Sequence, residues 1–144
     1  MTGDLPRTIA EIWTSRERTA RWHVLWIEHL RLQGADPDEI ERYQRVADGY
    51  RSGGLGDSID AATRDAMRRD RHEVVAALRA FNGYAGAESA HLGLASSDIV
   101  DPASQGQVLD SLCLVLDHAL HVAARVRRLM VAYAEVKLVA RTHG

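Results

Sequence analysis

The feature that most constrains the fold of this chain is a long amphipathic repeat in its last third. Apolar residues recur there at alternating steps of four and three, which is the spacing of one side of an α-helix. The first row consists of Val108, Leu112, Val115, Ala119, Val122, Val126, Leu129 and Tyr133. The flanking row consists of Leu109, Leu116, Leu120, Ala123 and Met130. Two adjacent apolar rows predict burial against more than one neighbouring helix.

The length of this repeat sets it apart from an ordinary core helix. A helix over residues 101–134 would be roughly 50 Å long at about 1.5 Å per residue. A globule of this chain length has a radius of gyration of about 15 Å, hence a diameter nearer 40 Å. We therefore expect the helix to extend beyond its own domain. It would pack against copies of itself, or against helices that these 144 residues do not include, as if a longer architecture had been interrupted.

Helix signals recur through the rest of the sequence. Thr14 and Glu17 form a capping-box pattern before residues 15–33, which carry an apolar face and end at a glycine. Asp36, followed by a proline at the first helical position, predicts a second helix through about residue 47. The apolar face of the first of these helices consists of Ala20, Val24, Ile27 and Leu30.

A third helix is predicted from Asp70 to Phe81, because Asp70 and Glu73 form another capping-box pair and Asn82-Gly83 follows. This places His72 in the first turn of that helix. No stretch of the chain has the sustained alternation and β-branched enrichment of a strand. The predicted fold class is all-α.

Composition narrows the function classes. The formal net charge is -2, so the chain has no general attraction for nucleic acid or for an anionic membrane. A single cysteine, Cys113, excludes an internal disulfide framework and a CxxC zinc site, which fits a reducing compartment and predicts a cytoplasmic protein. No run approaches 18 consecutive apolar residues, and the first residues contain no apolar signal, so we expect no membrane insertion.

The histidines and arginines outside the motifs below have ordinary interpretations. His118 and His121 are three residues apart but have no HExxH partner set, so surface or interface histidines are favoured over a metal site. The same interpretation applies to His23 and His29. The arginines at 64, 68, 69 and 71 alternate with acidic residues and indicate a solvated helix face. The glycine-rich residues 52–56 lack GK[ST] and predict a flexible connector.

Polar residues gather where the long helix begins and where the sequence ends. Ser96 is a plausible N-cap, Gly93 allows close backbone approach, and a helix start offers N–H groups to a carboxylate or phosphate. Pro102 predicts either a kink or a restart of the helix with Asp101 as its cap. Residues 141–144 place a cation, a hydroxyl and an imidazole side by side.

These segments together resemble the fumarate lyase superfamily, and within it adenylosuccinate lyases. Residues 91–101, HLGLASSDIVD, resemble that group's H-x-G-L-T-S-S-D-V-V-D segment, and residues 141–144, RTHG, its R-T-H-G-Q segment. Residues 70–76 and 12–15 resemble its T-x-H-D-V-V-A and I-W-S-x-E segments. The resemblance implies a small N-terminal helical domain, residues 1–92, followed at 93–144 by the first long helix of a central helical bundle.

The reaction that the resemblance implies is a β-elimination that releases fumarate from an N-substituted aspartate or related succinyl compound, in purine biosynthesis if the substrate is adenylosuccinate. His143 matches the general acid, and an imidazole with a reference pKa of about 6.5 can donate a proton at neutral pH. Ser96, Ser97 and Thr142 match carboxylate-binding positions, and His72 and His91 match substrate-pocket histidines. The resemblance implies no metal or other cofactor. It implies a homotetramer.

Three departures from the family pattern bear on the substrate. Ala95 stands where threonine is usual, Glu73 replaces an aspartate, and residues 1–7 lack the Arg-Tyr pair that helps hold a nucleotide phosphate. Another substituted succinate, or a cycloisomerase-like activity of the superfamily, is therefore also compatible. The serine loop that supplies the general base is absent from these residues, so we expect residues 1–144 alone to be inactive. The alternative function is a non-catalytic helical oligomerisation module with the same fold.

Overall fold

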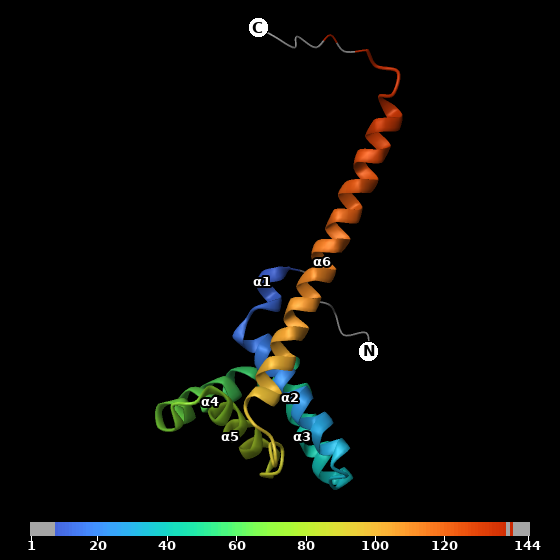
Figure 1. Cartoon of the computed structure of the whole chain (residues 1–144). Helices are drawn as coiled ribbons and strands as arrows, with labels where there is room; N and C mark the ends of the chain where they lie inside the picture. Colours follow the sequence, from blue (N-terminus) through green and yellow to red (C-terminus); the bar gives the residue numbers. More distant parts are fainter. Residues whose placement is uncertain (1–7, 138, 140–144) are drawn as a thin grey trace.

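The computed structural model describes residues 8–137 and 139, and the part of the chain that it describes contains helices and no strand (Figure 1). The all-α prediction is confirmed. Five helices cluster around the beginning of a sixth, which extends far beyond them. The helices are α1 (Ile9–Ile12), α2 (Ser15–Leu32), α3 (Pro37–Arg51), α4 (Gly56–Asp70), α5 (Glu73–Ala85) and α6 (Ser97–Ala132).

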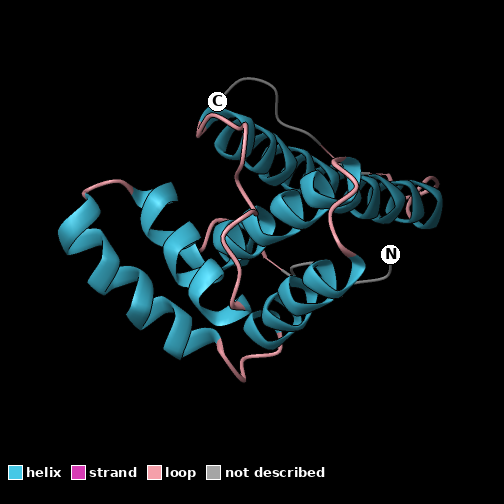
Figure 2. Cartoon of the chain, turned by 90° about the horizontal axis from the view of Figure 1, so that it is seen from below, coloured by secondary structure: helices cyan, strands magenta, loops and turns pink. Residues whose placement is uncertain are grey.

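An aromatic core joins the cluster. Helix α2 packs against α3 and α6, and α5 packs against α3 and α4. Figure 2 shows the helices and their connecting loops from below. The largest fully buried side chains are Trp22, Trp26, Tyr43, Tyr50 and Phe81, which come from three different helices. Burying a large apolar side chain stabilises the fold by about 1.5–3 kcal/mol, so this core is the main reason that the short helices fold together.

His23 belongs to this core, and its prediction as a surface or interface residue is wrong. The imidazole is fully buried, stacked on Phe81 with ring centroids 4.0 Å apart and planes 6° apart. Tyr50 packs edge-on against it at 4.8 Å. Neither ring nitrogen has a hydrogen-bond partner among the described residues. Burial lowers the pKa of His23 to about 3, because an imidazolium would lose its hydration there.

The boundary between α4 and α5 also differs from the expectation. Asp70 is the last residue of α4, and its carboxylate binds the guanidinium of Arg79 at 2.9 Å and 3.1 Å. Arg71 has a left-handed backbone with φ 50°, so the chain turns before His72, which is the N-cap of α5. His72 thus lies before the first turn. Helix α5 also continues past Asn82-Gly83 to Ala85, and α3 continues to Arg51 rather than ending near residue 47.

Helix α6 is continuous through Pro102, without a restart at Asp101. Its 36 residues correspond to about 54 Å. Pro102 lacks the N–H that would have bonded to the carbonyl of Asp98 in the first turn, and its ring crowds that same carbonyl. The loss therefore falls near the end of the helix, where the packed residues on either side maintain the helical geometry.

Within the described residues, most of the two apolar rows of α6 is not covered by another helix. Its buried residues are Ile99, Ala103 and Gln107, all in the first three turns. The large apolar side chains of both rows, from Val108 to Tyr133, are 47–69% exposed. Helix α6 therefore extends beyond the cluster of short helices. A contiguous apolar surface of this kind marks a region that becomes covered by another molecule or segment.

By length and composition alone, α6 is also able to cross a membrane. An 18-residue window within it reaches a mean hydropathy of 1.2, and 6% of that window is buried. The core helix of a soluble protein passes the same test, and the four-three spacing of the apolar rows is typical of a helix that packs against other helices. The composition of α6 therefore does not by itself indicate a membrane.

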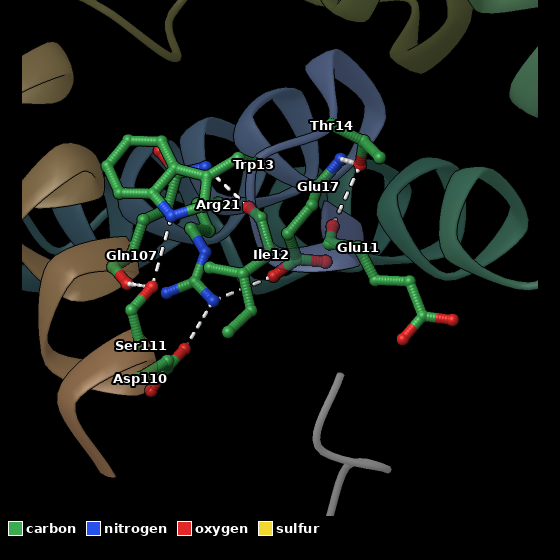
Figure 3. Close-up of polar contacts among 9 residues, drawn as sticks. All are labelled: Glu11, Ile12, Trp13, Thr14, Glu17, Arg21, Gln107, Asp110 and Ser111. Carbon is green, nitrogen blue, oxygen red and sulfur yellow. Dashed lines mark hydrogen bonds and ion pairs between the residues drawn. The ribbon is translucent and has the colours of Figure 1, made fainter. Parts of the chain in front are cut away.

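A small polar junction attaches α6 to the short helices (Figure 3). The amide nitrogen of Gln107, which is buried, donates a hydrogen bond of 2.6 Å to the carbonyl oxygen of Ile12. The hydroxyl of Ser111 donates to the carbonyl of Gln107 at 2.8 Å and accepts from the indole N–H of Trp13 at 3.0 Å. These contacts link the end of α1 to the fourth turn of α6.

Arg21 completes the junction from α2. Its guanidinium binds the carboxylate of Asp110 at 2.5 Å and that of Glu17 at 2.9 Å. A Cβ placed on Gly106 would lie 2.9 Å from the same guanidinium, so the glycine leaves the space that Arg21 occupies. The direction in which α6 leaves the cluster is therefore set by both packing and polar contacts.

We expect Gln107→Leu to lower the free energy of unfolding by about 1–3 kcal/mol, because it leaves the carbonyl of Ile12 buried without its donor. Urea unfolding followed by circular dichroism measures the change. Gln105→Leu is the matched control, because Gln105 lies on the same helix and is exposed. Equal stability of the two variants would contradict the role of this hydrogen bond.

Candidate ligand-binding site at the start of α6

The loop before α6 is held by one face of α2. Trp26 donates its indole N–H to Nδ1 of His91 at 2.9 Å. One turn later, Nε2 of His29 bonds to the carbonyl of Leu92 at 2.9 Å, and the amide nitrogen of Gln33 donates to the same carbonyl at 3.2 Å. Trp26 and His29 on α2 and Gln33 at its C-cap are spaced three and four apart, so they form one row along the helix. The row fixes both the ring of His91 and the backbone that follows it.

The loop then turns into α6. Gly93 has a φ of 79°, a conformation that side chains disfavour, and this allows the reversal of the chain before Leu94. Ser96 occupies the N-cap position, as predicted, but its hydroxyl makes no capping hydrogen bond. Instead, the carboxylate of Asp98 accepts the N–H of Ala95 at 2.8 Å. The hydroxyl of the half-buried Ser96 is therefore not used by the helix, and Ser97 beside it is exposed.

His72 lies at the start of α5. Its Nδ1 accepts the N–H of Val75 at 3.4 Å, and the residue is exposed. The carboxylate of the next residue, Glu73, is bound by the guanidinium of Arg18 on α2. The longer side chain that distinguishes Glu73 from an aspartate is thus engaged in an ion pair.

Electrostatics link these elements. The pKa of His91 is lowered, first by burial and then by the neighbouring His29 and His72, while the negative charge of Asp98 opposes the shift. Groups on α2, at the N-cap of α5 and on α6 therefore all act on one imidazole. The lowered pKa favours the neutral form of this imidazole, which lies beside the start of a long helix. Such a place offers uncharged N–H and O–H donors to an anion.

The structure describes four of the predicted site residues. Ser96 and Ser97 follow His91 at the start of α6, and His72 contributes to the lowered pKa of His91. Thr142 and His143 lie outside the described residues. Their relation to the loop therefore stays a prediction.

The sequence patterns did not identify three residues that hold the loop, Trp26, His29 and Gln33. His29 in particular was predicted to be a surface or interface residue. The available signal was their common helical row, with polar atoms repeating at three- and four-residue spacing. Only their partners, about 60 residues away, distinguish this row from a solvated one.

Metal binding receives no support from the described residues. Within residues 8–137 and 139, no three or more His, Cys, Asp or Glu side chains are arranged to hold a metal ion. His118 and His121 are exposed, and their Nδ1 atoms bond to the backbone carbonyls of Leu114 and Asp117 at 2.8 Å and 2.9 Å. The interpretation as surface or interface histidines agrees with these positions.

The fold and the candidate site together define the class of this protein. It is an all-helical protein in which a loop that contains a histidine leads into a long, largely uncovered helix. Comparison with known proteins gives a particular relative. The chain is similar to the adenylosuccinate lyase of Synechocystis sp., with 36% identity over 130 residues. The match covers 83% of this chain and 30% of the relative, so the chain spans less than a third of the length of the curated relative it matches. No family model and no solved structure matches the chain.

Proposed function

We propose that this chain is the N-terminal part of a carbon-nitrogen lyase of the fumarate lyase superfamily, similar to adenylosuccinate lyase. The reaction would be a β-elimination that releases fumarate from an N-substituted aspartate. The first substrate to test is adenylosuccinate. This substrate would place the reaction in purine biosynthesis, in the cytoplasm. Residues 1–92 would be the N-terminal domain, and residues 93–144 would begin the central bundle of a homotetramer. The residues 1–144 would be inactive alone.

The single observation that carries the proposal is the similarity to the Synechocystis enzyme. At most about a sixth of this chain lies outside the matched stretch, so residues 70–98 fall inside it wherever the match begins. That range contains His72, His91, Ser96 and Ser97. The similarity therefore includes the loop that the structure places at the start of α6.

The site has the chemistry that the first half of the elimination requires. Removing a proton next to a carboxylate adds charge to that carboxylate, and fixed donors stabilise it. The hydroxyls of Ser96 and Ser97 would bind the succinyl carboxylate, with Thr142 assisting, and His72 and His91 would line the substrate pocket. As the carbon-nitrogen bond breaks, its electron pair goes to the nitrogen, which takes a proton from His143. The electron pair of the broken carbon–hydrogen bond forms the double bond of fumarate, and the serine loop that these residues lack would take the proton.

Complementation tests this function. The 144-residue chain would be mixed with the part of the Synechocystis enzyme that lies beyond the matched stretch, and fumarate formation from adenylosuccinate and other substituted succinates followed by absorbance. We expect fumarate only in the mixture. Fumarate release by the 144-residue chain alone would contradict the prediction that this chain is inactive by itself. The absence of fumarate in every mixture and with every substrate would contradict the lyase proposal. Coding sequence adjacent to Gly144 that contains the missing serine loop would support it.

The uncovered α6 favours a second function, a helical oligomerisation module without catalysis. Both functions require the apolar rows of α6 to be covered, but only the lyase requires the serine loop. An assembled chain without fumarate release in any complementation mixture would favour the module.

We expect the chain to sediment as an oligomer, and Leu116→Lys with Leu120→Lys to convert it to a monomer. Both leucines are about 60% exposed, so charge at these positions prevents association without disturbing the fold. The matched control carries two lysines at His118 and His121, which belong to neither apolar row. Analytical ultracentrifugation measures the masses. A monomeric unchanged chain, or an unaffected leucine variant, would contradict self-association through these rows.

A further inference from the structure

The hydrogen bond between Trp26 and His91 determines which nitrogen of His91 carries the proton. Indole Nε1 is a donor only, and it lies 2.9 Å from Nδ1 of His91. Nδ1 must therefore accept and cannot hold a proton while this bond exists. In the neutral ring the single proton is then on Nε2. Among the described residues, no group takes a hydrogen bond from that Nε2.

The geometry around this bond is well constrained. Trp26 is fully buried, stacked on Phe81 at 5.6 Å, so its ring has no freedom to leave. The His91 ring meets it edge-on, with planes 89° apart. Leu92 follows His91. Its carbonyl oxygen can only accept a hydrogen bond, so Nε2 of His29 is the donor. Ring and backbone of the loop are thus both fixed from α2.

We propose that Trp26 is a positioning residue of the site: its indole N–H holds His91 as the Nε2–H tautomer, so that His91 presents an uncharged N–H donor to an anionic group of the substrate. The tautomer follows from the contact alone. The anionic substrate rests on the function proposed above.

The proposal separates the role of His91 from that of an acid or base. Protonating Nδ1 would place two N–H groups against each other, which costs the hydrogen bond and leaves the buried indole unpaired. His91 then binds an anion without taking up a proton. The other titratable groups that act on it are His29 on α2, His72 beside α5 and Asp98 on α6.

Histidine side-chain NMR tests the tautomer directly. In the ¹⁵N-labelled 144-residue chain, two-bond proton–nitrogen correlations distinguish Nδ1 from Nε2. We expect His91 to show an unprotonated Nδ1 and a protonated Nε2 at neutral pH. Trp26→Phe keeps an aromatic ring but removes the donor, and should shift the tautomer mixture toward Nδ1–H and move the pKa of His91 upward. A protonated Nδ1 in the unchanged chain would overturn the proposal without any variant.

Trp22→Phe is the matched control. Trp22 is as buried as Trp26 and lies one turn earlier on α2, but its indole N–H has no partner among the described residues. Both substitutions remove the same atoms from the same core, so a loss of stability should affect both. Only Trp26→Phe should change the His91 resonances. Equal spectra of His91 in the two variants would also overturn the proposal.

The complementation mixture supplies an independent measurement. Trp26→Phe should lower kcat/KM about tenfold, mainly through KM, the effect of one lost hydrogen bond, and Trp22→Phe should not. If the mixture releases no fumarate, the lyase function fails while the NMR result still decides the tautomer. If fumarate is released and Trp26→Phe leaves kcat/KM unchanged, the function stands and the positioning role fails.

Discussion

His143→Ala is expected to lower fumarate release in the complemented enzyme by about 10²- to 10⁴-fold, the usual contribution of a positioned general acid. The leaving nitrogen departs with an extra electron pair and requires a proton at that moment. Without the imidazole, water must supply that proton. The loss should appear in kcat, measured by steady-state absorbance, because the substitution leaves the serines that we propose to bind the carboxylate unchanged.

The control for this variant is His118→Ala, which removes an exposed imidazole from α6. Both variants should assemble to the same mass in ultracentrifugation and give the same circular dichroism spectrum. Turnover that is unchanged in His143→Ala would exclude it as the general acid. A loss accompanied by dissociation would indicate a role in assembly instead.

Lowering the pH from 7 to 4 is expected to reduce the free energy of unfolding by about 3 kcal/mol through His23 alone. The pKa of His23 is about 3 in the folded chain, chiefly through burial, against about 6.5 in the unfolded chain. Asp60 opposes this shift, and Arg51 reinforces it. The ring stacks on Phe81, and among the described residues neither of its nitrogens has a hydrogen-bond partner, so burial disfavours the protonated form.

The sign follows from proton linkage. Between pH 6.5 and pH 3 the unfolded chain binds a proton at residue 23 and the folded chain does not. The contribution of His23 is therefore fully present above pH 6.5 and is lost progressively as the pH falls toward 3. The lowered pKa of His91 acts in the same direction, so a comparison of variants is needed to isolate His23.

Urea unfolding at a series of pH values makes this comparison. His23→Leu removes the titrating group, and its stability should fall by about 3 kcal/mol less than that of the unchanged chain between pH 7 and pH 4. His118→Gln removes an exposed histidine and should leave the pH dependence unchanged. If His23→Leu and the unchanged chain lose the same stability, His23 is not neutral in the fold.

The sequence was most informative where structure depends on neighbours along the chain. The four-three spacing of residues 108–133 predicts α6 and its uncovered faces, because helical periodicity is a local property. Thr14 does cap α2, accepting the N–H of Glu17 at 3.1 Å, since the capping pattern spans three residues. The capping pattern at Asp70 was misleading because Arg79, nine residues away, binds that carboxylate instead.

The contacts of the candidate site join residues that are far apart in the sequence. The loop at His91 and the N-cap position of Ser96 could be identified from sequence motifs, but the role of Trp26 could not, because its partner is 65 residues away. No local pattern distinguishes a tryptophan that donates to a histidine from one, such as Trp22, that only fills the core.

By itself, the sequence determined that the chain is all-helical and that its last third forms one long helix with two adjacent apolar rows. These properties follow from spacing along one helix. Only the tertiary structure decided that His23 is a buried neutral ring, that Gln107 attaches α6 to α1, and that α2 holds the loop at His91. Each of these depends on residues brought together across 58 to 95 positions, where burial and hydrogen bonding, rather than periodicity, set the chemistry of a side chain.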